Sequence, residues 1–332
     1  MRIIAFIQTT SGPAYHRIIM PLLLMSNVDS NIDVYITNNL DEKDFEKGCD
    51  VLMYNRIVPD HALPTIAKLK KQYGFKVCVD VDDYWELDKH HILYNNYIEQ
   101  DFASKQIEQL KLADIVMVTN DRLANKVKPF NTNVYILPNA IPKQGQFDIE
   151  KIASPFTRLF WQGSQTHRKD IELLLPASAA LLQIAPQIKM VMAGYDDNCM
   201  EWKSMVHNYT SALRHQYKLI PAEPIVSYYQ VYKEADICLI PLLESNFNQY
   251  KSNLKVLEAA NLGLPCIVSN VHPYKDLPVI YANKSNDWAK EARRLVGSKK
   301  QQKEAGAKLK EYCDLHFDFY KINELRKQIL CK

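Results

Sequence analysis

The stretch "YKSNLKVLEAANLGLPCIVSN" at residues 250–270 combines two lysines, one glutamate in an otherwise apolar run, and a Gly-Leu-Pro turn. Its spacing predicts a helix that starts near Ser252 or Asn253 and a short β-strand after the turn. Lys251 then stands beside the helix N-terminus, where unpaired backbone N–H groups favour a phosphate. Glu258 lies about one and a half turns further in. Its carboxylate could accept hydrogen bonds from a diol such as a ribose, or it could be a surface glutamate of an amphipathic helix.

The rest of the chain repeats this pattern of strands and helices. Short apolar runs alternate with amphipathic stretches, which is typical of parallel, doubly wound α/β sheets. The runs form two series, so two Rossmann-like sheets in tandem are expected. The predicted strands are residues 2–8, 33–37, 51–56, 76–82, 114–120 and 134–139 in the first series, and 157–163, 188–194, 217–223, 235–241, 265–270 and 278–283 in the second.

The length of 332 residues also favours two domains, since a domain usually has about 100 to 200 residues. A linker is predicted at residues 142–156, where prolines and a glycine interrupt a stretch without apolar periodicity. We therefore expect an N-terminal domain at 1–145 and a C-terminal domain at 146–310. Residues 311–332 are expected to form a helix that packs back on the N-terminal domain.

The composition excludes several classes of protein. Hydrophobic residues make up 47% of the chain and charged residues 24%, as in ordinary globular proteins and unlike disordered or fibrous chains. The net charge of +3 creates no strong field for polyanions. The seven cysteines include no CxxC pair, and no apolar run is long enough for a membrane span. We expect a cytoplasmic protein that is a monomer or a weak oligomer.

A second candidate site lies in "FWQGSQTHRKDIELLL". A strand runs into a turn at Gly163, and a helix is expected to begin near Asp170. The side chains of His167, Arg168 and Lys169 would then lie beside the backbone N–H groups of a helix N-terminus, an arrangement that binds anions. The alternative is a solvated loop whose charges only cap the helix. No GxGxxG follows the first strand of either series, which argues against dinucleotide redox chemistry.

The loop after the first predicted strand reads "TTSGPAYHRIIMP". Ligands bind beyond the carboxyl ends of parallel strands, and this loop places Gly12, His16 and Arg17 at that edge. His16 or Arg17 could contact a donor diphosphate. In the alternative, Ser11 caps a helix and the two basic residues are solvated.

The stretch "VCVDVDDYWELDKHHILY" clusters three aspartates at a strand end: Asp80, Asp82 and Asp83. Oxygen ligands of this kind suit a hard cation, although the spacing is not that of an EF-hand. Alternatively, one aspartate or His91 could act as a base toward an acceptor hydroxyl, or the segment could be a structural turn. Tyr84 and Trp85 could stack against a sugar or a base, although aromatic residues at a strand end more often belong to the core.

Several of these segments resemble a known family. The segment "ADICLIPLLESNFNQYKSNLKVLEAANLGLPCIVSNV" resembles the donor-binding signature of GT-B glycosyltransferases, especially the retaining family-four group, also called glycosyl transferases group 1. "KDIELLLPASAALL", "VMAGYDD" and "YILPNAIP" resemble other segments of that group, and "GSQTHRKD" and "KSNLKVLE" are similar to its short bacterial and bacteriophage members. The resemblance implies an α/β protein of GT-B fold, with two Rossmann-like domains and a cleft between them.

The resemblance also assigns roles to individual positions. Lys169 falls on the family's diphosphate lysine, and Glu258 on the second glutamate of its EX7E motif. The chain departs from the family at Ser164, which takes an arginine position, and at Tyr250, which replaces the first glutamate. Lys251 would contact the phosphates, and Lys255 is expected on the outer face of the helix. The expected donor-binding residues are Gly12, Gly163, Ser164, His167, Arg168, Lys169, Lys251, Ser252, Asn253, Leu254 and Glu258, and the expected catalytic residues are His16, Arg17, Lys169, Asp82 and His91.

The implied function is the transfer of a sugar from a nucleoside diphosphate sugar to an acceptor hydroxyl. The resemblance implies retention of configuration and no requirement for a metal or another cofactor. The acceptor could be a surface glycan, a lipid-linked sugar or a hydroxylated base of phage DNA. Because Tyr250 replaces a glutamate, a relative that binds nucleotide sugars without turnover, or a nucleotide-sugar epimerase, is the alternative.

Overall fold

The computed structural model describes residues 1–184, 186–213 and 216–332. The chain packs into two compact units. Unit 1 comprises Met1–Asn139, Tyr250–Ser252 and Phe319–Lys332, and unit 2 comprises Ala140–Gln249 and Asn253–Asp318. The first crossing between the units therefore falls just before the predicted linker at 142–156. Two further short segments, one of which is the tripeptide 250–252, also pack with unit 1.

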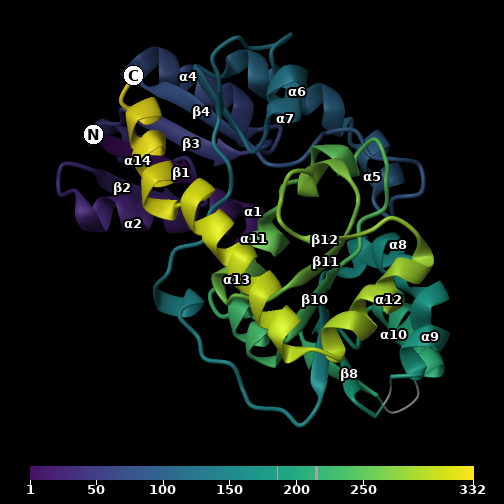
Figure 1. The fold of residues 1–332 in the computed structure, drawn as a ribbon. Helices are drawn as coiled ribbons and strands as arrows, with labels where there is room; N and C mark the ends of the chain where they lie inside the picture. Colours follow the sequence, from purple (N-terminus) through teal and green to yellow (C-terminus); the bar gives the residue numbers. More distant parts are fainter. Residues whose placement is uncertain (185, 214–215) are drawn as a thin grey trace. The chain divides into compact units, whose positions relative to one another are not determined.

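Unit 1 is built on a sheet of six parallel strands in the order β2-β1-β3-β4-β5-β6 (Figure 1). The inner strands read as almost continuous apolar runs and are buried along their length, as expected when helices cover both faces of a parallel sheet. The strands are β1 Arg2–Phe6, β2 Asp33–Thr37, β3 Val51–Asn55, β4 Lys76–Val81, β5 Ile115–Val118 and β6 Val134–Ile136.

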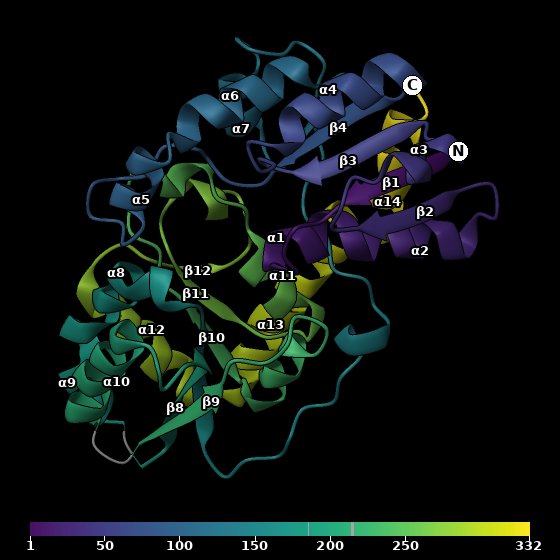
Figure 2. The same ribbon diagram turned by 180° about the vertical axis from the view of Figure 1, so that it is seen from behind.

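Helices cover both faces of the unit 1 sheet. Figures 1 and 2 show α4, α6 and α7 on one face and α2 with the C-terminal helix α14 on the other. The side chain of Asn323 on α14 donates a hydrogen bond of 2.9 Å to the carbonyl of Pro21, which ties the last helix to this unit. The helices are α1 Gly12–Ala14, α2 Met20–Val28, α3 Glu42–Glu46, α4 Ala62–Tyr73, α5 Tyr94–Glu99, α6 Phe102–Leu112, α7 Asp121–Val127 and α14 Phe319–Leu330, with a π-helical turn at Tyr15–Ile19.

Unit 2 has a second sheet of six parallel strands, in the order β12-β11-β10-β7-β8-β9. Its central strands β7, β10 and β11 are buried. The strands are β7 Thr157–Gln162, β8 Ile188–Tyr195, β9 Tyr217–Pro221, β10 Ile237–Ile240, β11 Cys266–Ser269 and β12 Ile280–Ala282.

The helices of unit 2 form two groups, with α8, α9, α10 and α12 on one face of the sheet and α11 and α13 on the other (Figures 1 and 2). A turn with Gly263 at φ 64° ends α11. A β-carbon on Gly306 of α13 would lie 1.9 Å from the Gly263 carbonyl oxygen, so only glycine permits this close helix contact. The helices are α8 Arg168–Ile171, α9 Ser178–Leu182, α10 Met200–Leu213, α11 Leu254–Asn261, α12 Ser285–Val296 and α13 Lys299–His316.

The twelve predicted strands are confirmed, and so is the prediction of two Rossmann-like sheets. The helix predicted near Asp170 differs in detail. A 3₁₀ turn at Gln165–His167 leads into α8, which begins at Arg168 and is one turn long. So short a helix sums few peptide dipoles, which weakens the expected anion site at its N-terminus.

Candidate functional site

Helix α11 holds Glu258 in the interior of unit 2. The neighbouring residues of the helix are apolar and buried, and only 3% of Glu258 is exposed. Its Oε2 accepts a hydrogen bond of 2.8 Å from Tyr232, its Oε1 accepts one from Tyr228, and its backbone carbonyl accepts one of 2.7 Å from Tyr229. The alternative of a surface glutamate is therefore wrong.

The environment of the Glu258 carboxylate leaves it able to accept more hydrogen bonds. Burial raises the pKa of this carboxyl, and the hydrogen bonds from Tyr228 and Tyr232 and the nearby Lys255 ammonium oppose that rise. A carboxylate offers about four acceptor positions, so the two tyrosines leave room for ribose hydroxyls. The ribose role of Glu258 stays a prediction. The tyrosines were missed in the sequence, where only the spacing of one helical turn between Tyr228 and Tyr232 could have pointed to them.

The turn after β7 is tightly packed around Gly163. A β-carbon on Gly163 would lie 2.7 Å from Cζ2 of the buried Trp161 and 3.3 Å from Cδ2 of His167. A glycine is therefore needed for the Trp161 ring to pack this closely against the turn.

The His167 ring is held by Asp170, a residue to which the sequence assigned no role. Asp170 is buried, and its Oδ2 lies 2.7 Å from Nδ1 of His167. Its Oδ1 accepts hydrogen bonds of 2.8 Å from the Leu243 backbone N–H and 3.2 Å from the Asn248 side chain. One carboxylate thus fixes the orientation of the imidazole and joins the loop after β7 to the loop after β10.

The other predicted residues of this loop are more exposed. Lys169 and Arg168 both pair with Glu172, at 2.9 Å and 3.3 Å. The Ser164 hydroxyl bonds to Thr166 at 2.7 Å. Exposed ion pairs are worth about 0–1 kcal/mol, so a diphosphate could draw either cation away from Glu172 at little cost.

The two lysines of the stretch "YKSNLK" lie in different units. The Lys255 ammonium lies 5.8 Å from the centroid of the Trp161 ring, on the strand that leads to Gly163. The expectation that Lys255 faces outward from the helix is therefore wrong. Lys251 packs with unit 1, where its Nζ lies 3.5 Å from Oδ2 of Asp83.

The remaining predicted donor residues lie at the start of α11, where the chain passes from unit 1 to unit 2. Asn253 is the N-cap of α11, without a side-chain capping bond, and Leu254 is the first helical residue. Ser252 packs with unit 1, and its hydroxyl accepts a hydrogen bond of 2.8 Å from Asn139. Unit 2 therefore contains the predicted residues Gly163, Ser164, His167, Arg168, Lys169, Asn253, Leu254 and Glu258, and unit 1 contains Gly12, His16, Arg17, Asp82, His91, Lys251 and Ser252.

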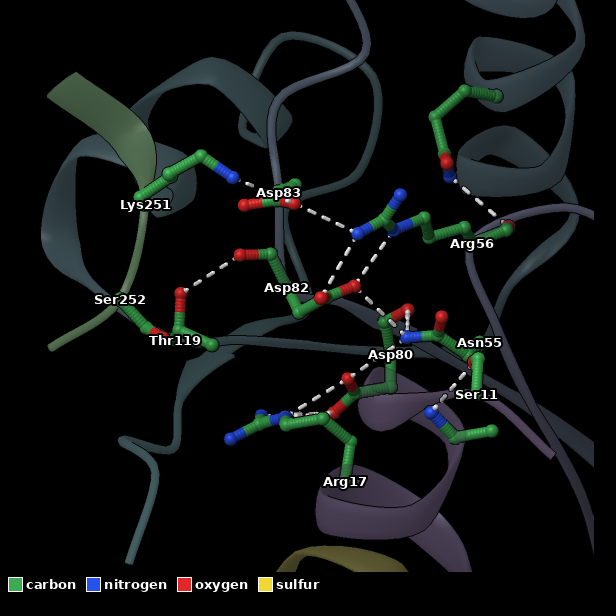
Figure 3. Close-up of polar contacts among 12 residues, drawn as sticks. Ser11, Arg17, Asn55, Arg56, Asp80, Asp82, Asp83, Thr119, Lys251 and Ser252 are labelled. Atoms are coloured by element: carbon green, nitrogen blue, oxygen red, sulfur yellow. Dashed lines mark hydrogen bonds and ion pairs between the residues drawn. The ribbon is translucent and has the colours of Figure 1, made fainter. Parts of the chain in front are cut away.

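In unit 1, Arg17 forms a buried ion pair with Asp80 at the carboxyl end of β4 (Figure 3). The guanidinium is 1% exposed, and its Nη2 lies 2.8 Å from Oδ2 of Asp80. It also donates to the Leu137 carbonyl at 2.7 Å and to the Asn139 side chain at 3.0 Å. The alternative that Arg17 is solvated is wrong, and the buried ion pair leaves little of the guanidinium for the predicted diphosphate contact.

His16 is also buried, next to Arg17. Burial, together with the charge of Arg17, lowers the pKa of His16 to about 3, so its imidazole is neutral at physiological pH. The expected Ser11 cap is present, since Ser11 Oγ accepts a hydrogen bond of 3.3 Å from the Ala14 backbone N–H. Gly12 is the first residue of α1, and a β-carbon there would meet no atom within 4 Å.

Asp82 and Asp83 are organised by Arg56, which the sequence did not indicate (Figure 3). Arg56 donates to Asp82 at 2.7 and 2.9 Å and to Asp83 at 2.9 Å. Burial disfavours the charged form of Asp82, but Arg56 and a hydrogen bond from Asn55 outweigh it, so the pKa of Asp82 lies below its usual value. Arg56 has φ 56°, a strained conformation for a residue with a side chain that is often found at functional sites.

A lowered pKa makes Asp82 a weak base and so argues against its predicted role as the base for an acceptor hydroxyl. His91 lies in the loop after β4, where its Nδ1 accepts a hydrogen bond of 3.2 Å from the Leu93 backbone N–H. Among the described residues, no group of three or more His, Cys, Asp or Glu side chains could hold a metal ion. Asp80, Asp82 and Asp83 pair with arginine and lysine instead.

No helix within residues 1–184, 186–213 and 216–332 is both long and apolar enough to cross a membrane.

Comparison with known proteins identifies the class. Residues 157–298 match the family described as Glycosyl transferases group 1. No curated protein matches the chain significantly in sequence. Among solved structures, HepE of Anabaena, in complex with UDP and glucose, is similar over 100% of this chain and 99% of its own, with 12% identity and a TM-score of 0.70.

Two further structures agree. A glycosyltransferase from Rickettsia africae is similar over 99% of this chain and 97% of its own, with 10% identity and a TM-score of 0.67. TarM of S. aureus is similar over 88% of this chain and 58% of its own, with 12% identity and a TM-score of 0.64. The predicted GT-B fold is thereby confirmed. The chain is a glycosyltransferase, and its residues 157–298 match the model of glycosyl transferases group 1.

Proposed function

We propose that the chain transfers a sugar from a nucleoside diphosphate sugar to an acceptor hydroxyl, and that unit 2 binds the donor. The observation that carries this proposal is the placement of Lys255 and Glu258 on α11. The two residues are three positions apart and share one side of the helix. Lys255 lies over Trp161, the residue two before Gly163, and Glu258 is one turn deeper in unit 2.

This spacing suits the two polar parts of a nucleoside diphosphate. The diphosphate would lie at the start of α11, near Lys255 and the Gly163 turn, where backbone N–H groups and cations favour it. His167, oriented by Asp170, and Lys169, released from Glu172, would complete the phosphate contacts. The ribose hydroxyls would then donate to Glu258.

The charges proposed around the diphosphate also suggest how transfer is promoted. The bond between the anomeric carbon and the diphosphate oxygen breaks, with its electron pair left on the diphosphate, and a bond from the acceptor oxygen to that carbon forms. The acceptor hydroxyl gives its proton to the departing diphosphate, which supplies the base. Cations fixed beside the departing diphosphate stabilise the negative charge that develops there. These side chains are not the oxygen ligands that Mg²⁺ prefers, so we propose transfer without a metal. Retention of configuration follows from the family resemblance and is part of the proposal.

UDP and its sugars are the first ligands to test. HepE was solved with UDP and with UDP-glucose, and this similarity supports a uridine nucleotide here. A ligand that binds only the folded protein stabilises it by about 2.7 kcal/mol at 100 times its Kd. We therefore expect UDP and UDP-glucose to raise the melting temperature, measured by thermal unfolding of the whole chain. A melting temperature unchanged by every nucleoside diphosphate tested would contradict the donor site.

Three variants locate the binding. Glu258→Gln keeps the size of the side chain but loses its charge, and Lys255→Met removes the ammonium. Each is expected to weaken UDP binding about tenfold or more, because a hydrogen bond to a charged group is worth about 1.5–3 kcal/mol. Lys290→Ala is the matched control, since Lys290 is 74% exposed on α12. Equal UDP affinity in the wild type, Glu258→Gln and Lys255→Met would show that the nucleotide binds elsewhere.

A further inference from the structure

Unit 1 contains a pocket that the donor site does not use. It has a volume of about 590 Å³ and lies beside the segment that follows β4. This volume is within the range of about 300–1,000 Å³ that small-molecule sites usually have. The lining residues that matter here are Tyr84, Trp85, Arg122, Lys126, Phe130 and Tyr250.

Aromatic side chains form one wall of this pocket. The Tyr84 ring lies 4.5 Å from the Tyr250 ring and 4.9 Å from the Trp85 ring, measured between centroids. Phe130 continues the wall, with its centroid 6.3 Å from that of Trp85. Packing holds these rings in place, and the Tyr250 carbonyl accepts a hydrogen bond of 2.9 Å from Asn120. Only 5% of Tyr84, 4% of Trp85 and 7% of Tyr250 are exposed, so a sugar would contact a small but fixed part of each ring.

Two cations border the aromatic wall. Arg122 and Lys126 are four residues apart on α7 and therefore lie on the same side of the helix. The Lys126 ammonium is 5.4 Å from the Tyr84 ring centroid and 5.8 Å from that of Tyr250, and no acidic side chain of the described residues pairs with it. Glu86 is the one acidic residue among the described lining residues, and the Lys126 ammonium is the cation available to an anionic group.

We propose that this pocket binds an acceptor saccharide that carries a phosphate or carboxylate group. The sugar ring would pack against Tyr84 and Tyr250, and its anionic group would pair with Lys126, supported by Arg122. The inference rests on the proposed function, because it treats unit 1 as the acceptor side of a glycosyltransferase. It also gives Tyr250 a role: this residue replaces a glutamate of the family signature and contributes a ring to the acceptor pocket.

Saturation-transfer NMR on the whole chain tests the proposal with three sugars, glucose, glucuronate and glucose 6-phosphate. Inorganic phosphate, which has no carbon-bound proton to observe, is measured as a competitor that displaces glucose 6-phosphate. We expect glucuronate and glucose 6-phosphate to bind at least about tenfold more tightly than glucose, since a charge-assisted contact is worth that factor or more. The tighter of the two identifies the preferred anionic group. Inorganic phosphate that binds as tightly as glucose 6-phosphate would overturn the proposal, because the aromatic wall would then contribute nothing. Equal affinity for glucose and the charged sugars would overturn it as well.

Variants show whether the probes occupy this pocket. Lys126→Ala should weaken the charged sugars about tenfold and leave glucose unchanged, whereas Tyr250→Leu should weaken all three sugars. Lys111→Ala is the matched control, because Lys111 is an exposed lysine of α6 outside the lining. Unchanged binding of the charged sugars by Lys126→Ala would place them elsewhere and overturn the proposal.

UDP binding separates this proposal from the donor proposal. Lys126→Ala should keep the wild-type stabilisation by UDP. Failure of UDP to stabilise any form, with the sugar results as expected, would overturn the donor site and leave the pocket as a saccharide site. Normal UDP binding without selective binding of charged sugars would overturn the pocket alone.

Discussion

The two units surround a buried carboxylate in different ways. In unit 1, Asp80 is paired with the guanidinium of Arg17, and in unit 2, Glu258 accepts hydrogen bonds from two tyrosines. Burial raises the pKa of both carboxyls, and in each case these partners oppose the rise. A carboxylate that loses a buried cation is left uncompensated, whereas one bound by neutral hydroxyls can exchange a hydroxyl for that of a ligand. The comparison indicates that Asp80 depends on its cation, whereas Glu258 can exchange a hydroxyl partner, as the proposed donor site requires.

The largest expected effect is the loss of the charged pair in unit 1. Arg17→Met removes the cation that is hydrogen-bonded to Asp80, although the charge of the buried Arg326 still acts on this carboxyl, and should lower the free energy of unfolding by about 3–5 kcal/mol. The double variant Arg17→Met/Asp80→Leu removes both charges and should recover much of that loss. Urea denaturation measures both. Lys68→Met is the control: Lys68 is 69% exposed and pairs with Glu42 at 3.6 Å, so a change below about 1 kcal/mol is expected.

Two results would contradict this account of the ion pair in unit 1. A small effect of Arg17→Met would show that Asp80 tolerates burial without its ion-pair partner, with the charge of Arg326 as sufficient compensation. A double variant as unstable as Arg17→Met would show that the packing of the Arg17 side chain, and not the charge of Asp80, is responsible.

The next largest expected effect is a pH dependence of the free energy of unfolding, caused by His16 in unit 1. The pKa of His16 is lowered to about 3 in the folded chain, against an ordinary value of 6.5, so only the unfolded chain takes up a proton between these values. Protons therefore favour unfolding, and His16 should cost about 1.4 kcal/mol of stability for each pH unit below 6.5. The free energy of unfolding, measured from pH 7 to pH 5, should fall less steeply in His16→Gln. Parallel pH profiles for the two proteins would mean that His16 is protonated in the folded chain.

The fold could be predicted because strands leave a local signal. The runs that form β1 to β12 are short and apolar, and buried parallel strands need such runs whatever packs on them. Three residues of the proposed donor site could be singled out for a similar reason: Gly163, His167 and Glu258 belong to local motifs, and their role in binding stays a prediction. The expected face of Lys255 was wrong because most of α11 is buried, so helical periodicity does not distinguish an inner from an outer face.

Contacts between residues far apart in the sequence could not be predicted. Arg17 and Asp80 are 63 residues apart, and Tyr228 and Glu258 are 30 apart. The sequence shows that these residues can ionise or form hydrogen bonds, but only the packing of the sheets decides which of them meet. Tyr250 is a further case, because its ring contact with Tyr84 joins segments that carry no shared pattern.

The smallest expected effects separate the two tyrosines that hold Glu258. Tyr232 is buried and its hydroxyl donates to a carboxylate, so Tyr232→Phe should lower the free energy of unfolding by about 1.5 kcal/mol, the lower value for a hydrogen bond to a charged group. Tyr228 is half-buried, and Tyr228→Phe should cost less stability because water can replace its hydroxyl.

If a ribose hydroxyl takes over the position of the Tyr228 hydroxyl on Oε1, Tyr228→Phe should bind UDP as tightly as the wild type or up to a few-fold more tightly. Urea denaturation and UDP titration of the two variants measure both quantities. A loss of UDP affinity in Tyr228→Phe would mean that this hydroxyl contacts the nucleotide itself, and the contrast between a fixed ion pair in unit 1 and an exchangeable hydrogen bond in unit 2 would no longer hold.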